Sequence, residues 1–345
     1  MKDVIPSQFR TAVAARLAIL VAASSLAAAA SPAEFLGKPD EWFASPEGRR
    51  TAAYILSWQS GQGSWPKNQD STRSEFTGDR ATLKGTFDNG ATTGELRFLA
   101  RAFRATGDKP CEEAFLAGFD HILAAQYANG GWPQYFPPGR KYHRHITFND
   151  GSMVRLLEFL RQTATDDDFR FLDPPRRAAA AKALGRGVDC IVKCQIPVRG
   201  TLTVWCAQHD EITLAPAAAR AFELPSLSGA ESAGILCFLM TLDHPSPEVI
   251  RAVSAGAAWF EAVKIEGIRI EKIDGDRKVI PDASAPPVWA RFLEIETNRP
   301  FFCGRDGVRK YDISQIDPER RNGYAWYGNW GESVAKAYAR WPYRR

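Results

Sequence analysis

Apolar residues recur three and four positions apart along much of the chain, and polar segments separate the stretches that carry this pattern. Such spacing places apolar side chains on one face of an amphipathic α-helix. The segment from Ile268 to Pro281 instead alternates apolar and polar residues about Asp274-Gly-Asp, which is typical of a β-hairpin. The sequence therefore predicts a mainly α protein. The helical pattern is carried by Leu96, Leu99, Ala100 and Phe103; by Phe115, Phe119, Ile122 and Leu123; by Val154, Leu157 and Leu160; by Ile235, Phe238 and Leu239; and by Val249, Val253 and Ala257.

A weak internal repeat runs through the first two thirds of the chain. Gly63-Ser-Trp-Pro-Lys-Asn recurs as Gly131-Trp-Pro-Gln-Tyr, and Thr86-Phe-Asp-Asn-Gly recurs as Thr147-Phe-Asn-Asp-Gly. A degenerate third copy is expected at Ser226-Leu-Ser-Gly-Ala, which also precedes a helical segment. Each unit is expected to be a helical hairpin with a loop.

Helical hairpins that repeat in this way can close into a ring, with their connecting loops gathered at one end. We therefore predict an (α/α)3 toroid-like barrel of helical hairpins with long loops and a small β-hairpin. Loops of different repeats would meet around one cleft, so Asp88 and Asp150 are expected to face each other. The loop tryptophans, Trp65 and Trp132 among them, are expected mainly to plug helix ends.

The first part of the chain differs from the rest. Lys2, Arg10 and Arg16 precede an apolar run that begins at Leu17 and ends in alanines at Ala30. This run is shorter than the roughly 20 residues that a membrane-spanning helix needs. We therefore predict a secretory signal peptide over residues 1–30 and a single catalytic domain over residues 31–345. The mature protein is expected to be secreted or periplasmic, without membrane association.

Composition and charge narrow the class of protein. With 45% hydrophobic and 24% charged residues, the chain can build a sizeable core. The formal net charge is only +4, so a nucleic-acid partner is not expected, and affinity for an anionic polymer would need a local cationic patch. The six cysteines lack paired CxxC spacing and are expected to pack in the core.

The candidate chemistry begins with two aspartates beside asparagines. Asp88-Asn89-Gly90 and Asn149-Asp150-Gly151 each stand immediately before a predicted helix. Aspartate and asparagine are common helix caps, and their oxygens are also the ligands that calcium takes from several loops. A pair of carboxylates would equally serve a glycosidase. Capping, a metal site and a glycosidase pair all remain open on these residues alone.

Three arginines stand in polar loops of the later half: Arg220 before Phe222-Glu-Leu-Pro-Ser, Arg291 before Phe292-Leu-Glu, and Arg305 in Cys303-Gly-Arg-Asp-Gly-Val. A guanidinium fork matches a carboxylate with two hydrogen bonds, so several of them suit a polyuronate. Each arginine taken singly is equally explained as a surface ion pair.

Several longer motifs stand in one order from about Trp42 to Trp330, and together they resemble polysaccharide lyase family 10, a family of pectate lyases. The resemblance implies a largely helical (α/α)3 toroid and endo-acting cleavage of polygalacturonate, with calcium bridging enzyme and substrate. The motifs are Gly61-Gln-Gly-Ser-Trp-Pro-Lys-Asn, Gly85-Thr-Phe-Asp-Asn-Gly-Ala-Thr, Gly130-Gly-Trp-Pro-Gln-Tyr-Phe-Pro, His145-Ile-Thr-Phe-Asn-Asp, Phe222-Glu-Leu-Pro-Ser and Glu296-Thr-Asn-Arg-Pro-Phe-Phe.

The resemblance also implies roles for individual residues. Asp88 and Asp150 fall where the family has its metal- and substrate-binding aspartates, with Asn89 beside them as a substrate-binding residue. Gly151-Ser-Met-Val follows Asp150 where a further acidic residue often stands, so calcium coordination is expected to differ slightly.

The three arginines also match positions of the family by alignment. Arg220 falls at the proton-abstracting arginine, and Arg291 and Arg305 fall where substrate-binding arginines are expected.

The implied reaction is calcium-assisted β-elimination of α-1,4-polygalacturonate to 4,5-unsaturated oligogalacturonides by a monomeric enzyme. Arginine has a reference pKa of about 12.5–13.8, so an arginine base predicts activity that rises on the alkaline side. Two alternatives remain. An α/α-toroid glycoside hydrolase would use Asp88 and Asp150 directly and would work in chelator, and a non-catalytic pectin-binding protein would release no new ends.

Overall fold

The computed structural model describes residues 31–344, so the predicted signal peptide, residues 1–30, lies outside the described residues. About 47% of these described residues are helical and the strands are short, which confirms the prediction of a mainly α fold. The α-helices are α1 (Asp40–Ala44), α2 (Pro46–Ser57), α3 (Thr93–Thr106), α4 (Lys109–Ala124), α5 (Ser152–Thr165), α6 (Pro174–Cys194), α7 (Gly229–Leu239), α8 (Pro247–Ala262), α9 (Pro318–Gly323) and α10 (Trp330–Arg340). Single 3-10 turns are η1 (Pro32–Phe35), η2 (Arg80–Thr82), η3 (Asp88–Gly90), η4 (Lys141–Arg144), η5 (Asn149–Gly151), η6 (Asp167–Phe169) and η7 (Ile313–Gln315).

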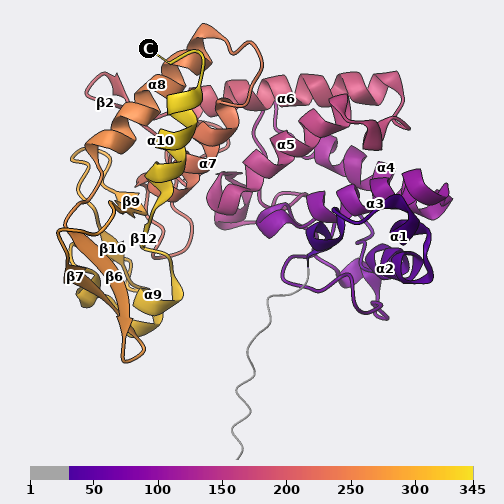
Figure 1. Ribbon diagram of the computed structural model, residues 1–345, viewed down its shortest axis with the longest axis horizontal. Coiled ribbons are helices and arrows are strands. Elements are labelled where there is room, and N and C mark those ends of the chain that lie inside the picture. The colour runs from indigo at the N-terminus through magenta and orange to yellow at the C-terminus, as the bar shows by residue number, and fades with distance from the viewer. Residues whose placement is uncertain (1–30, 345) are drawn as a thin grey trace, which may run out of the picture.

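The long helices form three hairpins that stand side by side (Figure 1). Helix α3 packs on α4, α5 packs on α6, and α7 packs on α8. Contacts also join α3 to α5 and α5 to α7 in one row, and α4 to α6 and α6 to α8 in a second row. Helix α2 packs against α3 and α4 at one end of the series, whereas α10 packs against α7 and α8 at the other. This is the arrangement that the repeated hairpin pattern predicts.

Local signals explain where several outer helices begin. Ser45, Asp173 and Ser246 each accept a hydrogen bond from a backbone N–H in the first turn of α2, α6 and α8, respectively. In all three helices proline is the first helical residue, where its missing N–H costs no intrahelical hydrogen bond. Helix α3 ends at Gly107, whose φ of 69° is left-handed.

Buried tryptophans fasten each loop to the end of an outer helix. Trp65, Trp132, Trp205 and Trp289 donate their indole N–H groups to backbone carbonyls of α2, α4, α6 and α8, over 2.7–2.9 Å. All four rings are buried, so each indole N–H needs such a partner. The prediction that these tryptophans plug helix ends is confirmed.

Three glutamines tie consecutive repeats together. Gln59 donates to the carbonyls of Gly63 and Ala114, over 3.0 and 2.8 Å. Gln126 bridges to Gly130 and Ala183, and Gln195 bridges to Thr203 and Ala252, all over 2.9 Å. Each amide thus joins its own loop to the next outer helix. The same bond recurs in every repeat, which shows that the units are structurally equivalent.

The degenerate third copy of the repeat is confirmed by backbone geometry. The N–H of Thr86 donates to the carbonyl of Trp65 over 2.9 Å, and that of Thr147 donates to Trp132 over 3.1 Å. In the third unit the N–H of Ser228 donates to the carbonyl of Trp205 over 2.8 Å. The third copy therefore follows the same backbone plan, but Ser228 rather than the predicted Ser226 makes the bond of Thr86, two residues later than expected.

Short antiparallel strand pairs connect the loops. The predicted β-hairpin is confirmed, and its two-residue turn holds Asp274 and Gly275 at φ 50° and 80°, as a type I′ turn requires. The pairs are β1 (Ile146–Thr147) with β4 (Gln208–His209), β2 (Pro197–Val198) with β3 (Thr201–Leu202), β5 (Leu227–Ser228) with β9 (Phe292–Leu293), β6 (Ile268–Ile273) with β7 (Asp276–Pro281), β8 (Trp289–Ala290) with β12 (Tyr327–Gly328), and β10 (Phe302–Cys303) with β11 (Arg309–Lys310).

The main core fills the space between the helices, and a second buried cluster lies under the later loops. Phe222, Phe292, Phe301 and Trp326 belong to this second cluster. It supports the segments that carry Arg220 and Arg291, which adjoin Phe222 and Phe292 in the chain. The six cysteines are free thiols, and five of them are buried, as expected for core packing. Within residues 31–344, the helices are too short or too polar to cross a membrane.

Candidate active site

Two equivalent turns carry the predicted aspartates. Turn η3 precedes α3 and turn η5 precedes α5, and the two turns contact each other. The second residue of each turn, Asn89 or Asp150, has a left-handed backbone with φ of 54° or 51°. Asparagine and aspartate tolerate this conformation better than other side chains. The turn geometry therefore accounts for the Asp-Asn and Asn-Asp dipeptides before any chemistry is considered.

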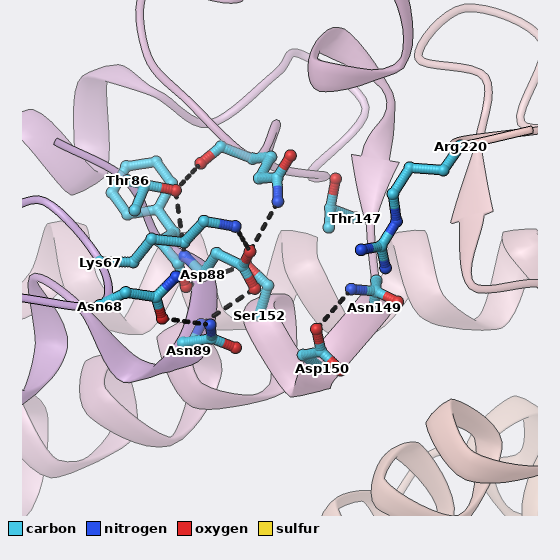
Figure 2. Close-up of polar contacts among 12 residues, drawn as sticks. Lys67, Asn68, Thr86, Asp88, Asn89, Thr147, Asn149, Asp150, Ser152 and Arg220 are labelled. Atoms are coloured by element: carbon cyan, nitrogen blue, oxygen red, sulfur yellow. Dashed lines mark hydrogen bonds and ion pairs between the residues drawn. The ribbon is translucent and has the colours of Figure 1, made fainter. Parts of the chain in front are cut away.

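The carboxylate of Asp88 is buried and fully engaged. Its side chain is 2% exposed, and its Oδ2 atom accepts hydrogen bonds from the Lys67 ammonium and, over 2.7 Å, from the Gln134 amide. Its Oδ1 atom accepts the backbone N–H of Asn89 over 2.9 Å. Burial lowers the pKa of Lys67, but the hydrogen bond and charge of Asp88 outweigh burial and raise it. Figure 2 shows these contacts converging on one carboxylate.

Lys67 and Gln134 occupy the same position in two repeats. Each is the residue that follows a Trp-Pro pair, and both side chains meet at the same oxygen of Asp88. From the sequence, the two Trp-Pro segments were expected only to pack over helix ends. The sequence did hold a signal for their role in the site. Both residues are polar, they share one repeat position, and each repeat also has a loop that carries a carboxylate.

The carboxylate of Asp150 is more exposed and less engaged. Its side chain is 41% exposed, and Oδ2 accepts a 2.7 Å hydrogen bond from the Asn149 amide. Arg291 lies 3.5 Å from Oδ1, but its principal partner is the buried Glu231. Burial lowers the pKa of Arg291, yet the charge of Glu231 more than offsets this effect and raises it. Arg291 thus stands at the edge of the site as a fixed cation.

Arg220 approaches the two turns from the other side. Its side chain points toward Asn149 and Asp150 (Figure 2). The guanidinium forks the buried Glu223, with Nε donating to Oε2 over 2.7 Å and Nη2 donating to Oε1. The hydrogen bonds that Arg220 donates to Glu223 raise the pKa of Arg220 despite partial burial. Sequence reasoning placed Glu223 only within a motif, and its role as the arginine's anchor was missed.

These side chains surround one polar cavity of about 270 Å³. Four predicted residues, Asp88, Asn89, Asp150 and Arg220, line it, and Arg291 reaches it through Asp150. Arg305 is not among the lining residues. Its exposed guanidinium instead donates two hydrogen bonds of 3.1 Å to Glu319. The other lining residues are Lys67, Asn68, Gln134, Tyr135, Tyr142, His143, Asn149, Gln208 and Glu223.

The donor set of this cavity fits a hard cation. The amide oxygens of Gln134, Asn149 and Gln208 are buried and have no hydrogen-bond partner among the described residues. Unpaired buried carbonyl oxygens beside carboxylates are the groups that calcium coordinates. The residues of the cavity can therefore hold a metal ion, with Asp150 the more available carboxylate because Lys67 already neutralises Asp88.

A second acidic cluster lies outside this cavity. His145, Asp210 and Glu211 have potential ligand atoms within 4.8 Å of one another. However, Glu211 binds the Arg144 guanidinium with one oxygen and lies 2.9 Å from the His145 ring with the other. One oxygen of Asp210 accepts two backbone N–H groups of its own turn. These contacts describe an ion-pair cluster with a capped turn rather than the predicted calcium site.

The comparisons with known proteins agree with this site. The model of the pectic acid lyase family matches residues 59–335, which is more than half of the chain. A family 10 polysaccharide lyase from Cellvibrio cellulosa is similar in structure, with a TM-score of 0.80 and 36% sequence identity over 90% of this chain and 96% of that one. No curated protein matches the chain.

A mutant of the lyase from the same organism, in complex with trigalacturonic acid, is equally similar. It shares 36% identity and a TM-score of 0.80, over 90% of this chain and 97% of that one. Because this likeness covers nearly the whole of both chains, it confirms the α/α toroid that the hairpin repeat predicts. The chain belongs to the pectic acid lyase family, which is family 10 of the polysaccharide lyases, and it is an enzyme of the pectate lyase class.

Proposed function

We propose that the protein cleaves α-1,4-polygalacturonate by calcium-assisted β-elimination, with Arg220 as the base. The observation that carries the proposal is that Arg220 and the turns of Asp88 and Asp150 enclose one polar cavity. The trigalacturonic acid complex of the similar Cellvibrio lyase supports a polygalacturonate substrate. The products would be 4,5-unsaturated oligogalacturonides.

β-Elimination removes the proton on C5 of a galacturonate, forms a C4–C5 double bond and breaks the bond between C4 and the glycosidic oxygen. The difficulty is the charge that builds on the neighbouring carboxylate as the proton leaves. Calcium held by Asp88, Asp150 and the amide oxygens beside them would supply positive charge against this carboxylate. Arg291, a fixed cation at the edge of the cavity, adds a second positive group.

The chain's own residues also position the substrate. Asn89 is exposed at the turn beside Asp88, where its amide can bind a sugar hydroxyl or carboxylate. Arg291 can bind a uronate carboxylate at the Asp150 side. Arg305 stands outside the cavity and would meet only a longer polymer. We assign all three to substrate binding, with Arg305 the outermost.

The state of Arg220 governs the expected pH dependence. Glu223 raises its pKa, so the guanidinium is protonated in the free protein at neutral pH. A base must lose that proton before it can take one from C5. The rate is therefore expected to rise with pH on the alkaline side.

Two other functions are outcomes of the same assay. A glycoside hydrolase would use Asp88 and Asp150 as acid and base, but Lys67 and Gln134 occupy one oxygen of Asp88. A pectin-binding protein would need no catalytic group.

The proposal includes a monomeric enzyme that is secreted or periplasmic after removal of residues 1–30.

The test is ultraviolet absorbance of the unsaturated product from polygalacturonate at alkaline pH, with calcium and then with excess chelator. A calcium-dependent rise is expected. Arg220→Ala should abolish it in a protein that still folds, although thermal unfolding should occur at a lower temperature because the buried Glu223 loses its cation. New reducing ends without absorbance would mean hydrolysis. Neither signal from folded protein would mean a binding role, and a normal rate in Arg220→Ala would remove this residue from the base role.

A further inference from the structure

The loop that carries Arg220 is built around the carboxylate of Glu223. Besides the guanidinium, Oε2 of Glu223 accepts the backbone N–H of Arg220 over 3.1 Å. The N–H of Glu223 donates to the carbonyl of Arg220 over 2.8 Å, which closes a tight turn. The hydroxyl of Tyr324 donates to Oε1 of Glu223 over 2.9 Å. Glu223 is thus held by its own turn and by a second segment more than a hundred residues later.

Aromatic rings hold the plane of the same guanidinium. The Arg220 guanidinium carbon lies 4.8 Å from the ring centre of Phe222 and 5.8 Å from that of Tyr324. Both rings pack edge to face at 5.3 Å in the second buried cluster. A guanidinium with two forked hydrogen bonds and two aromatic neighbours has little freedom to rotate.

This arrangement leaves one nitrogen of Arg220 for chemistry. Nε–H and Nη2–H are both donated to Glu223, whereas Nη1 has no hydrogen-bond partner among the described residues. The guanidinium points into the space beside Asn149 and Asp150 (Figure 2). A lone pair on Nε, or on Nη2 in place of the proton that Glu223 accepts, would face the carboxylate and be repelled by it. A lone pair on Nη1 would face the cavity.

We infer that Glu223 is a positioning residue that confines the basic lone pair of neutral Arg220 to Nη1 and aims it at the substrate. The inference rests on the proposed role of Arg220 as the base. The relation is the one by which a carboxylate fixes the tautomer of a catalytic histidine. In the neutral form, Nη1 carries the lone pair while Nε and Nη2 keep the protons that Glu223 binds.

The proton transfer balances on this assignment. The Nη1 lone pair takes the C5 proton, and the C–H electrons form the C4–C5 double bond. The electrons of the C4–O bond leave with the glycosidic oxygen, which takes a proton from water. The guanidinium then returns its proton to the solvent. The new positive charge forms directly beside Glu223, which stays ionised because its bonds to Arg220 lower its pKa despite burial.

Glu223 acts on Arg220 in two opposed ways. It raises the pKa of Arg220, so less of the neutral base exists at a given pH, but the base that does exist is stronger. By fixing the tautomer, Glu223 also aims the lone pair at the substrate, and this effect does not reduce the fraction of neutral Arg220. The other ionisable groups that act on Arg220, or that share its aromatic rings, are Lys67, Tyr142, Arg291, Arg305, Arg320 and Tyr324.

The test compares Glu223→Gln with Asp276→Asn. Asp276 accepts two hydrogen bonds of 2.7 Å from Nε and Nη2 of Arg321. This is the same geometry as that of Glu223 with Arg220, but it lies away from the cavity, so Asp276 is a matched control. In Glu223→Gln we expect kcat on polygalacturonate to fall about 100-fold, since a misplaced tautomer costs more than lost binding, while KM changes less than about threefold. The rate should still rise between pH 8 and pH 10, because the ordinary pKa of arginine, about 12.5–13.8, lies above this range. Asp276→Asn should match the unsubstituted protein.

Three results would overturn the inference: a kcat within threefold of normal, a loss confined to KM, or the same loss in Asp276→Asn. If Glu223→Gln does not fold, Glu223→Asp replaces it. The shorter side chain keeps the charge but, from the backbone at position 223, cannot reach both nitrogens of Arg220 equally, so a normal kcat in Glu223→Asp also contradicts the inference. Arg220→Ala separates the two proposals: if it is inactive while Glu223→Gln is normal, the base assignment stands and only this inference fails.

Discussion

Turns η3 and η5 have the same backbone shape and opposite charge distributions. In the first, aspartate fills the buried position and asparagine the exposed one, whereas in the second asparagine is buried and aspartate is exposed. The difference follows from their neighbours. Asp88 meets Lys67 and Gln134, which follow Trp-Pro in two successive repeats. The corresponding residues for Asn149 are Gln134 and Ala207, and neither of them is a cation.

The comparison teaches that only one of the two carboxylates is free. A charge in the buried position needs a paired cation, and the first repeat provides one. The second repeat instead buries a neutral amide, whose oxygen has no hydrogen-bond partner in the described part of the chain, and moves the carboxylate to the exposed position. On this account Asp88 chiefly holds the site together, and Asp150 is the principal carboxylate for metal and substrate.

Exchanging the two residues of the second turn should have the largest effect. Asn149→Asp with Asp150→Asn would copy the order of the first turn without its lysine. The buried carboxylate would lack a cation, so unfolding free energy should fall by about 1–3 kcal/mol. Activity should be lost, which the absorbance assay and denaturant unfolding can measure together. Full activity in this variant would show that the order within the turn is irrelevant.

Asp150→Asn alone should separate activity from stability. Asparagine tolerates the left-handed backbone at this position, and the side chain is 41% exposed. Unfolding free energy should change by no more than about 0.5 kcal/mol. The rate with saturating calcium should fall about 100-fold, as for loss of a group that acts on transition-state charge. A large drop in thermal stability would instead make Asp150 a structural residue.

Lys67 and Asp88 should be coupled in stability. Asp88→Asn would leave a largely buried ammonium without its carboxylate, and Lys67→Met in the same chain should recover part of the loss. A double-mutant cycle should give about 1–3 kcal/mol of coupling.

The pH dependence of this coupling between Lys67 and Asp88 follows from the pKa of Lys67, which is raised above 10.5 in the folded state. The pair contributes its full stabilisation at pH values below the ordinary lysine pKa of 10.5. This stabilisation is lost as the pH rises through the raised pKa of the folded state. Coupling that is absent at pH 8 would contradict this account.

Glu95 offers a further contrast between the repeats. Burial raises its pKa to about 7. Its Oε2 atom has no hydrogen-bond partner within residues 31–344, although Ser71 donates to Oε1 over 3.1 Å. Its counterpart one repeat later is the buried Leu156.

A raised carboxyl pKa means that the folded state binds the proton more tightly. Stability is therefore full below about pH 4.5 and falls as pH rises to about 7. At pH 8, Glu95→Gln should be more stable than the unsubstituted protein by up to about 3 kcal/mol. Thermal unfolding at pH 5 and pH 8 would show this, and a variant that is less stable at both would refute it.

Arg305→Ala should have the smallest effect. Its exposed pair with Glu319 is worth less than about 1 kcal/mol, and it lies outside the cavity. KM for long polygalacturonate should rise about threefold, while the rate on trigalacturonate should be unchanged. A loss of kcat on the short substrate would place Arg305 inside the site.

Much of this could be predicted from the sequence. The two clear repeats, the hairpin at Asp274-Gly275 and the meeting of Asp88 and Asp150 follow from local patterns that the fold preserves. The place of Arg220 beside them followed only from the family resemblance. The partners of those residues could not be predicted, because Lys67 and Gln134 reach Asp88 only when two loops meet. Nor does spacing reveal that Asp88 and Asp150 occupy different positions in equivalent turns. That distinction depends on burial, which the tertiary packing decides.

The most direct test of the division between the turns is the free calcium concentration that gives half of the maximal rate of unsaturated product formation. It should be measured for the unsubstituted protein, for Asp276→Asn and for the residual activity of Asp150→Asn. The account predicts at least about a tenfold higher calcium requirement in Asp150→Asn, because calcium affinity follows the number of charged ligands, and no change in Asp276→Asn. An unchanged requirement in Asp150→Asn would contradict the assignment of Asp150 to the metal.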